Sequence, residues 1–327
     1  MGISTKKPVF NLRPGTKIRG KWHQNTYQIV KVLGSGAIGT VYLALYNQRS
    51  VALKISHQPS AITTEVNVLK AFEKAQGKRL GPSLIDVDDW VPKQADSYSF
   101  YVMEYLKGQS LNSFIQQKGD DWLGIMMIQL LGDLHQLHQI GWVFGDLKPE
   151  NLIVTHSPSR LRWIDVGGTT KQGRAIKEYT EFYDRGYWEL GSRKADPAYD
   201  LFAVAMVMIQ VYYPDRFDKG HQPYQTLMNK IKANQQLRSY RTCLEKALRG
   251  QYSSSAQMQK ELAQKIAEKR KQPIPRSQPS AATSKQKSYT SVQQKSSPPK
   301  WLESLGIATV TGVLYVFYLL LQVISTF

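Results

Sequence analysis

The sequence predicts an α+β protein of two lobes, a β-rich N-terminal lobe and a helical C-terminal lobe, followed by a disordered basic linker and one C-terminal transmembrane helix. Three observations support this prediction. Short apolar runs separated by turns fill residues 27–55, helical periodicity dominates after residue 107, and the last 23 residues carry no charge. The expected parts are a polar leader over 1–20, a folded domain over 21–271 with lobes at about 21–103 and 107–271, a linker over 272–300 and a membrane anchor over 305–327.

The charge balance is strongly basic. There are 43 lysines and arginines against 25 aspartates and glutamates, which gives a net charge of +18. A surplus of this size attracts polyanions such as nucleotides, nucleic acids or acidic membrane surfaces. The single cysteine, Cys243, excludes an internal disulfide and is typical of a reducing compartment. The first residues are polar and basic, so the sequence does not predict an export signal.

Three strands are expected in the N-terminal lobe, at 27–33, 40–45 and 51–55. The turn between the first two is rich in glycine, and glycines let a backbone approach phosphates closely and point its amides at them. The residues of this turn that we assign to nucleotide binding are Gly34, Ser35, Gly36, Ala37, Gly39 and Val41. Because the turn joins two strands rather than opening a helix, it favours a loop that covers phosphates over a dinucleotide-binding fold.

A lysine lies near the end of the third strand. An apolar strand that carries Lys54 must direct the ammonium group toward an anion or a carboxylate. We expect that carboxylate to be Glu65, in a stretch over 62–72 whose apolar residues share one helical face. The alternative is a solvated surface glutamate.

The most informative stretch is 143–154, where an apolar run turns into a short polar loop and resumes as a second apolar run. Asp165 follows, with two glycines shortly behind it. Asp146 is placed to orient a hydroxyl nucleophile, and Lys148 adds a cation where a transferred phosphoryl group gathers charge. Asn151 and Asp165 offer oxygens that hold Mg²⁺, or Mn²⁺, against a polyphosphate. This arrangement predicts phosphoryl transfer.

These motifs occur in the order found in the eukaryotic-like (Hanks-type) protein kinases, and the resemblance covers roughly residues 22–258. It implies a bilobal kinase fold, ATP with Mg²⁺ as phosphate donor and protein hydroxyls as acceptors. Lysine two positions after Asp146 resembles the serine/threonine rather than the tyrosine kinases. Longer strings at 141–146, 164–170 and 179–188 resemble tail-anchored bacterial members of the family.

The resemblance also implies roles in catalysis. Asp146 would act as the catalytic base, and Lys148 would steady the γ-phosphate. Lys54 would hold the α- and β-phosphates while paired with Glu65.

For nucleotide and metal, the resemblance implies that Asn151 and Asp165 hold Mg²⁺. Met103 would be the gatekeeper, and the backbone from Glu104 to Leu106 would take the adenine edge. The full set of nucleotide contacts that we expect is Gly34, Ser35, Gly36, Ala37, Gly39, Val41, Ala52, Lys54, Met103, Glu104 and Leu106.

Two departures from the family pattern lie beside the key aspartates. Phe144 and Gly145 stand where most members have His-Arg, so the usual reader of a phosphate on the activation segment is missing. We therefore expect activation from elsewhere, such as ligand-driven clustering. Val166 replaces a phenylalanine after Asp165, and we expect its side chain still to fill an apolar slot.

The end of the activation segment is a third departure. In most members of the family this segment ends with Ala-Pro-Glu. If Thr180 and Tyr183 are aligned with the family's threonine and tyrosine, Tyr187 takes the position of that glutamate. Counting back from Asp200 places Glu189 there instead. Gln251 stands where the arginine partner of that glutamate is expected. How this segment is anchored is left open.

The uncharged stretch 305–327 is long enough to span a membrane. A helix of 23 residues is about 34 Å long, against a hydrocarbon core of ~30 Å. The alternative is a buried core helix. We expect a tail anchor in the cell membrane, crossing once, with the kinase domain in the cytoplasm and Trp301 at the interface.

The segment before the anchor is basic, with nine cations against one acid, Glu268. The cations are Lys265, Lys269, Arg270, Lys271, Arg276, Lys285, Lys287, Lys295 and Lys300. This charge of +8 is consistent with a solvated tether, with binding to anionic lipid headgroups, or with binding to DNA without sequence preference.

Protein substrates and self-association for trans-autophosphorylation complete the expected partners, with Thr169, Thr170 and Thr180 and the linker serines and threonines as candidate sites. Two other functions remain open. One is a pseudokinase scaffold that binds nucleotide without turnover. The sequence argues against it because it contains the full set of residues that transfer needs, Lys54, Asp146, Lys148, Asn151 and Asp165. The other is a membrane-tethered protein that binds DNA non-specifically.

Overall fold

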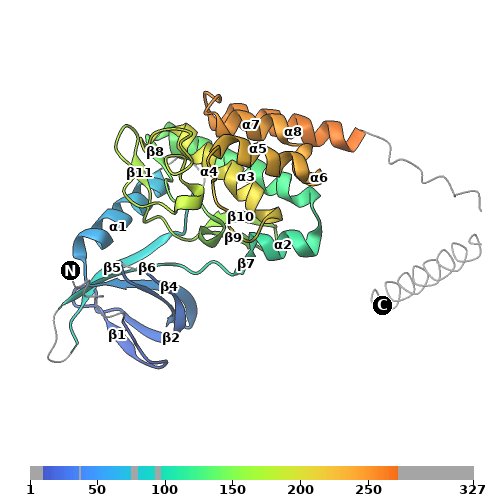
Figure 1. Ribbon diagram of the computed structural model, residues 1–327. Coiled ribbons are helices and arrows are strands. Elements are labelled where there is room, and N and C mark those ends of the chain that lie inside the picture. Colours follow the sequence, from blue (N-terminus) through green and yellow to red (C-terminus); the bar gives the residue numbers. More distant parts are fainter. Residues whose placement is uncertain (1–9, 37, 75–79, 93–96, 272–327) are drawn as a thin grey trace, which may run out of the picture. The chain divides into compact units, whose positions relative to one another are not determined.

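Six antiparallel strands form the sheet of the N-terminal lobe, in the order β1-β2-β3-β4-β6-β5 (Figure 1). Their bounds are β1 Lys17–Arg19, β2 Thr26–Ser35, β3 Thr40–Tyr46, β4 Arg49–Ser56, β5 Leu84–Trp90 and β6 Tyr98–Glu104. Helix α1 (Pro59–Lys74) packs against β4, β5 and β6. This computed structural model describes residues 10–36, 38–74, 80–92 and 97–271, which belong to one compact unit.

The start of the chain contributes to this lobe rather than forming a separate polar leader. Ile18 on β1 is fully buried, and Phe10 and Leu12 pack against the same core. Tyr42 donates to the carbonyl of Phe10 at 2.6 Å and accepts from the amide of Leu12 at 3.1 Å. The expectation of a leader over 1–20 was therefore wrong for residues 10–20, because single buried residues among charged ones give no periodicity to read.

Hydrogen bonds with Asp86 and Asp88 hold the turn between β1 and β2 against β5, and we call this group the clasp. His23 Nδ1 lies 2.6 Å from Asp86 Oδ1, and the amides of Trp22 and His23 donate to the carboxylate of Asp88 at 2.9 and 2.8 Å. Burial alone would raise the pKa of Asp86, but hydrogen bonds from Asn25, Tyr27 and His23 lower it. Each carboxylate is thus satisfied by N–H and O–H donors of the protein.

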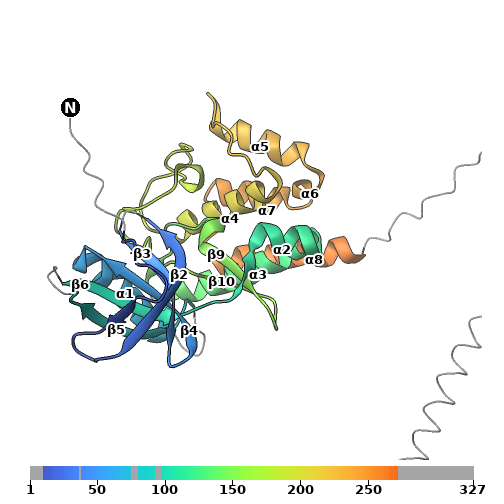
Figure 2. The same ribbon diagram turned by 90° about the horizontal axis from the view of Figure 1, so that it is seen from below.

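The C-terminal lobe is helical, and α4 runs through its centre with almost every side chain buried. The helices are α2 Leu111–Lys118, α3 Asp121–Gln139, α4 Pro197–Tyr212, α5 Pro223–Ala233, α6 Gln235–Arg238, α7 Arg241–Leu248 and α8 Ser255–Lys271. Asp196 caps α4 by accepting from the amide of Tyr199, and Pro197 occupies the first helical turn. In Figure 2 the six-stranded sheet and α1 form one group, and the helices α2 to α8 form the other.

Short strands between α3 and α4 carry the segments that form the site. β9 (Leu152–Thr155) pairs with β7 (Gly108–Ser110) and β10 (Arg160–Trp163), while β8 (Trp142–Val143) pairs with β11 (Thr170–Lys171). The apolar runs on both sides of the 144–151 loop are therefore strands, as predicted.

Aromatic packing joins the two lobes behind the site. The ring of Trp163 lies 5.8 Å from that of Phe72 on α1 and 4.9 Å from that of Phe144. All three are nearly fully buried. Phe144 is thus a core residue that packs two positions before Asp146. Val166 is buried in the same core, as we expected of an apolar side chain at that position.

The helices differ from the sequence expectations mainly at their ends. The apolar pattern of residues 238–248 predicts one helix there, but α7 begins only at Arg241, because Asn234 caps α6 and Ser239–Tyr240 separates the two helices. Helix α8 runs from Ser255 to Lys271 and closes the described part of the chain. Within the described residues no helix is both long and apolar enough to cross a bilayer, and the predicted anchor at 305–327 lies outside them.

Candidate active site

Lys54 and Glu65 form a buried ion pair between β4 and α1. The Lys54 ammonium lies 2.8 Å from Glu65 Oε1 and 2.7 Å from Oε2, and Tyr101 donates to Oε2 at 2.8 Å. Both residues are buried, so each charge requires the opposite charge of the other to offset its loss of hydration. Burial acts to lower the pKa of Lys54, but the carboxylates of Asp165 and Glu65 outweigh it and the pKa is raised. The surface alternative for Glu65 is excluded.

Asp165 brings the C-terminal lobe to this pair. Its Oδ1 lies 3.7 Å from the Lys54 ammonium and accepts from the amide of Gly167 at 2.9 Å. About half of the Asp165 side chain is exposed, at 48%, so oxygen is left to bind a ligand. The predicted meeting of Lys54 and Asp165 at one place is therefore present.

The catalytic-loop residues converge on Asp146. Lys148 Nζ lies 2.5 Å from Asp146 Oδ2, and Asn151 Nδ2 donates to the Asp146 carbonyl at 2.8 Å and to Oδ2 at 3.2 Å. Thr180, far along the activation segment, donates to Asp146 Oδ1 at 3.2 Å and accepts from Lys148 at 3.2 Å. We predicted the cluster of Asp146, Lys148 and Asn151, and Thr180 completes it.

Asp200 on α4 fixes the backbone of the loop that carries Asp146 by accepting two hydrogen bonds from it. It accepts from the amides of Phe144 at 2.8 Å and Gly145 at 2.9 Å, and His138 Nε2 lies 2.8 Å from its Oδ2. His138 in turn meets Ser255 Oγ at 2.8 Å. All of these polar groups are buried and satisfied. His138 lies on α3, and a contact between a histidine and a buried aspartate far along the chain leaves no periodic signal in the sequence.

Gly145 is required by the close packing of two backbones. Its φ is +80°, and a Cβ there would lie 2.6 Å from the carbonyl oxygen of Gly168. A Cβ on Gly168 would lie 2.6 Å from that of Asp146. An arginine at 145 would push the catalytic loop away from the segment that carries Asp165, so the departure from the family pattern has a local steric reason.

The glycine-rich turn is a hairpin between β2 and β3. The amide of Gly36 donates to the carbonyl of Gly39 at 2.9 Å, and a Cβ on Gly39 would lie 2.4 Å from the carbonyl oxygen of Ile55. A Cβ at Gly34 or Gly36 would meet no described atom within 4 Å, which leaves their backbone open to a ligand. Ala37 lies outside the described residues.

The expected adenine contacts lie on adjacent strands. Ala52 on β4 pairs in register with Met103 on β6, and both are buried. Val41 packs at the edge of the same core, and Leu106 is buried after the strand ends. The side chain of Glu104 accepts instead from the amide of Ser83 and from Arg162, each at 3.2 Å, which fixes the connection between the lobes.

The activation segment is anchored by Asp184, a residue that the sequence analysis did not single out. Its buried carboxylate accepts from the amides of Gly186 and Tyr187, from Arg193 Nε at 2.7 Å and from the Tyr199 hydroxyl at 3.0 Å. A single aspartate among aromatic and arginine residues was the available signal.

Neither alternative for the family's glutamate provides the anchor. Glu189 has a φ of +58° and pairs with Lys219 at 2.5 Å near the surface. Tyr187 packs against Trp188, and Gln251 is exposed. Trp188 is fully buried and packs against Phe182 and Phe217. Aromatic packing and the hydrogen bonds of Asp184 therefore anchor the activation segment together.

The donor set fits a magnesium nucleotide. Asn151 Oδ1 accepts no hydrogen bond from the described residues, and the Asp165 carboxylate is half-exposed beside Lys54. Carboxylate and amide oxygens are the ligands that Mg²⁺ prefers, and the ammonium supplies charge for phosphates.

Of the basic linker residues, only Lys265 has a described side chain, and it pairs with Glu268 on α8 at 2.8 Å. Three more, at 269–271, end this helix, and the others lie outside the described residues. Their partners stay predictions.

Comparison with known proteins agrees with this geometry. The family described as protein kinase domain matches residues 27–290. The chain is 54% identical over 276 residues to the serine/threonine-protein kinase YabT of Bacillus subtilis, covering 84% of this chain and 81% of that protein. It is 28% identical over 172 residues to the serine/threonine-protein kinase PknG of Mycobacterium leprae, covering 49% of this chain and 21% of that protein.

Among solved structures, vaccinia related kinase 3 matches with a TM-score of 0.60 and 17% identity, over 82% of this chain and 94% of that one, which shows the shared fold. The fold is the bilobal one, the family is matched over most of the chain, and its members use ATP and Mg²⁺. The chain therefore belongs to the protein kinase family, as a serine/threonine protein kinase.

Proposed function

We propose that this kinase transfers the γ-phosphate of ATP to serine and threonine hydroxyls of proteins, its own included, from the cytoplasmic face of a membrane. The observation that carries the proposed chemistry is the convergence of Lys54, Glu65 and Asp165 on one side and of Asp146, Lys148 and Thr180 on the other. One group can hold phosphates and metal, and the other can hold the acceptor.

In this proposal the acceptor hydroxyl approaches Asp146, which takes its proton as the oxygen attacks the γ-phosphorus. The bond from the γ-phosphorus to the oxygen that bridges it to the β-phosphate breaks, and ADP leaves. Lys148 lies where it can steady the charge on the transferred group, and Lys54 is oriented by Glu65 to hold the other phosphates. Mg²⁺, held by Asn151 and Asp165, would neutralise phosphate charge.

The test uses the full chain, purified in detergent, with labelled MgATP and a generic protein substrate. We expect Asp146→Asn to lower the rate of transfer by about a hundredfold or more, because a general base contributes on that order. Asp215→Asn is the matched control, since it makes the same change of charge at an exposed residue. A wild-type protein that binds ATP but transfers nothing would favour the pseudokinase alternative.

Membrane attachment rests on the uncharged stretch 305–327, which is of spanning length. In a liposome flotation experiment, we expect the full chain to float and a chain that ends at residue 304 to stay at the bottom. Flotation of both forms would assign membrane binding to another part of the chain.

Regulation by polyanions rests on the charge of +8 over residues 265–300. We propose that DNA or anionic lipid brings kinase domains together there and accelerates trans-autophosphorylation. Duplex DNA and phosphatidylserine vesicles are added separately, over a range of salt concentrations, because phosphate contacts weaken as salt rises. A rate that neither additive changes at any salt concentration would contradict this proposal.

The matched variants each replace four lysines with glutamine. The first changes Lys285, Lys287, Lys295 and Lys300, and the control changes the exposed Lys70, Lys107, Lys118 and Lys232 of the kinase domain. We expect only the first to lose the acceleration. An equal loss in both would point to net charge rather than to the linker.

A further inference from the structure

The first 64 residues contain no aspartate or glutamate, and the first acidic residue of the chain is Glu65. This stretch carries nine cations, which is half of the net charge of +18. They are Lys6, Lys7, Arg13, Lys17, Arg19, Lys21, Lys31, Arg49 and Lys54. The basic segment over 265–300 carries +8, so these two regions together hold +17 of the +18. The first of them belongs to the folded N-terminal lobe.

Strand β1 and the residues that follow it display three of these cations in a row. Lys17, Arg19 and Lys21 are exposed, while Ile18 and Gly20 between them are buried. Successive residues of an extended chain point to opposite sides, so the three cations share the outer side and follow one another at about 6.7 Å. The row lies at the edge of the sheet, because β1 is its first strand.

In the part of the chain that the structure describes, no carboxylate forms an ion pair with these three cations. The nearest acids are the three aspartates of β5. Asp86 and Asp88 are buried in the clasp. Asp89 accepts from Nε1 of Trp22 at 3.1 Å and from the hydroxyl of Ser99 at 2.7 Å. The row therefore presents net positive charge to solvent.

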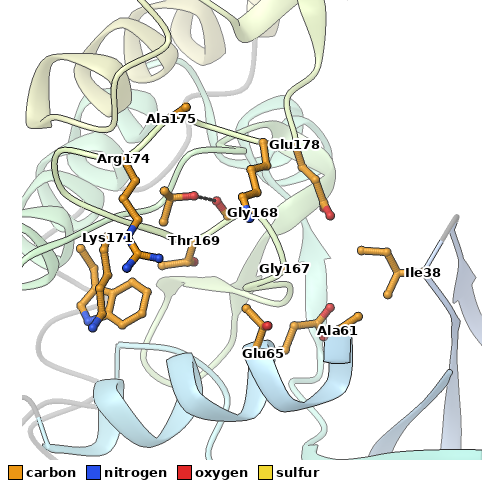
Figure 3. Close-up of a pocket in the computed structure, with 14 residues that line it drawn as sticks. Ile38, Ala61, Glu65, Gly167, Gly168, Thr169, Lys171, Arg174, Ala175 and Glu178 are labelled. Carbon is orange, nitrogen blue, oxygen red and sulfur yellow. Dashed lines mark hydrogen bonds between the residues drawn. The ribbon is translucent and has the colours of Figure 1, made fainter. Parts of the chain in front are cut away.

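Other cations of the domain have acids beside them. In the cavity of about 280 Å³ between α1 and the activation segment, Lys171 and Arg174 share the walls with Glu65 and Glu178 (Figure 3). The row on β1 differs from such mixed surfaces, because its own stretch of chain supplies no acid.

Two large apolar side chains are exposed beside the row. Trp22 is 64% exposed, and the Lys21 ammonium lies 4.4 Å from the centroid of its ring. Leu45 on β3 is 37% exposed and pairs in register with Gln28 of β2, which pairs with Lys17. Residues paired in this way lie on the same face of a sheet. An exposed indole among cations is typical of a surface that meets the interface between water and lipid.

We propose that the face defined by Lys17, Arg19, Lys21, Trp22 and Leu45 docks on a membrane surface that contains anionic lipid. The cations would contact the headgroups, and the indole would enter the interfacial layer. Docking would fix the orientation of the N-terminal lobe at the bilayer, which a tether alone does not do. The proposal rests on the proposed function for the attachment of the chain to a membrane.

The length of the chain allows this contact. The 33 residues over 272–304 separate the end of α8 from the uncharged stretch. Fully extended, they span at most about 115 Å, against a diameter of about 45 Å for a domain of this size. The β1 face can therefore reach the bilayer. Duplex DNA would satisfy the cations but offers no apolar layer for the indole, so a membrane fits this face better.

The test labels the lysines of the full chain with acetic anhydride in the presence of vesicles, and mass spectrometry measures the rate at each lysine. Vesicles that contain phosphatidylserine are compared with vesicles of phosphatidylcholine alone. We expect the anionic vesicles to slow the labelling of Lys17 and Lys21 by about fivefold, the factor for one cation at an anionic surface. The exposed Lys70, Lys118 and Lys232 should change much less. The protection should disappear in about 1 M salt, which screens surface charge.

Three variants of the full chain measure the parts of the face. Arg19→Gln removes a cation but neither reporter lysine, so it should lower the protection severalfold. Arg238→Gln, the same change at an exposed arginine of α6, is its control and should have no effect. Trp22→Ala should also lower the protection, because the indole no longer enters the interfacial layer. The variant with four linker lysines replaced should keep the protection, since the β1 face acts independently of the linker.

Equal protection of all five lysines would mean diffuse attraction and would overturn the proposal, as would full protection in Arg19→Gln or in Trp22→Ala. Duplex DNA is added without vesicles as a further arm, and protection as strong as that by phosphatidylserine would assign the face to nucleic acid instead. Flotation with phosphatidylcholine vesicles tests the tail anchor separately. A chain that does not float with them, but whose Lys17 and Lys21 are protected by phosphatidylserine, would contradict the anchor and support this face.

Discussion

Thr180 and Asp146 are joined by a hydrogen bond of 3.2 Å across thirty-four positions of sequence. The bond couples the activation segment to the loop that would accept the substrate hydroxyl. Thr180 also accepts from Lys148, so the three side chains hold one another in place. A change at Thr180 therefore reaches the proposed base without touching it.

Replacing Thr180 separates its hydroxyl from its shape. We expect Thr180→Val to lower kcat by about tenfold to a hundredfold, because a hydrogen bond to a charged group is lost. Thr180→Ser should retain most of the activity. Steady-state kinetics with a protein substrate measures both. Full activity of Thr180→Val would show that the bond has no part in transfer.

The anchor of the activation segment gives a prediction about stability. We expect Asp184→Ala to lower the free energy of unfolding by about 3 kcal/mol, because it leaves Arg193, Tyr199 and two amides without their common acceptor. Glu189→Ala should have a much smaller effect, since its pair with Lys219 lies at the surface. Urea denaturation compares them. A larger loss of free energy of unfolding in Glu189→Ala than in Asp184→Ala would show that Glu189, and not Asp184, anchors the segment.

The clasp on the N-terminal lobe predicts a pH dependence. The hydrogen bond with Asp86 raises the pKa of His23 above its ordinary value of 6.5, and the pKa of Asp86 is lowered from 3.8. The stabilisation from His23 is thus complete below 6.5 and disappears as pH rises through the folded pKa. The part from Asp86 is present above 3.8 and is lost as pH falls through its own folded pKa.

We therefore expect His23→Gln to lower Tm most between pH 4 and 6.5, and hardly at all at pH 9. The exposed His221 provides the control, as His221→Gln. Thermal melts at a series of pH values test this. A difference in Tm that stays constant with pH would mean that the imidazole acts by packing and not by charge.

Cys243 should be unreactive in the folded protein. It is buried in α7, and burial together with Glu261 raises its pKa to about 11, so little thiolate exists at pH 8. We expect iodoacetamide to modify it slowly in buffer and quickly in urea. Fast modification of the folded chain would indicate that α7 opens readily.

Much of the site could be predicted because its residues follow short, regular segments. Lys54 lies near the end of a strand, and Asp146 and Asn151 lie in a loop between strands, so their roles could be inferred from local pattern. The anchoring by Asp184 and the support of Asp200 by His138 could not, because each joins residues that only the tertiary fold brings together. The bonds of Tyr101 to Glu65 and of Thr180 to Asp146 were missed for the same reason.

The central claim is that Lys54, Asn151 and Asp165 serve one magnesium nucleotide. Equilibrium binding of ATP to the full chain, with and without Mg²⁺, tests it most directly, with Asp165→Asn beside the exposed control Asp215→Asn. We expect Mg²⁺ to tighten ATP binding in the wild type and in Asp215→Asn, and to have no such effect in Asp165→Asn, because a metal-ligating charge is lost. The same Mg²⁺ dependence in Asp165→Asn as in the wild type would contradict this assignment of the site.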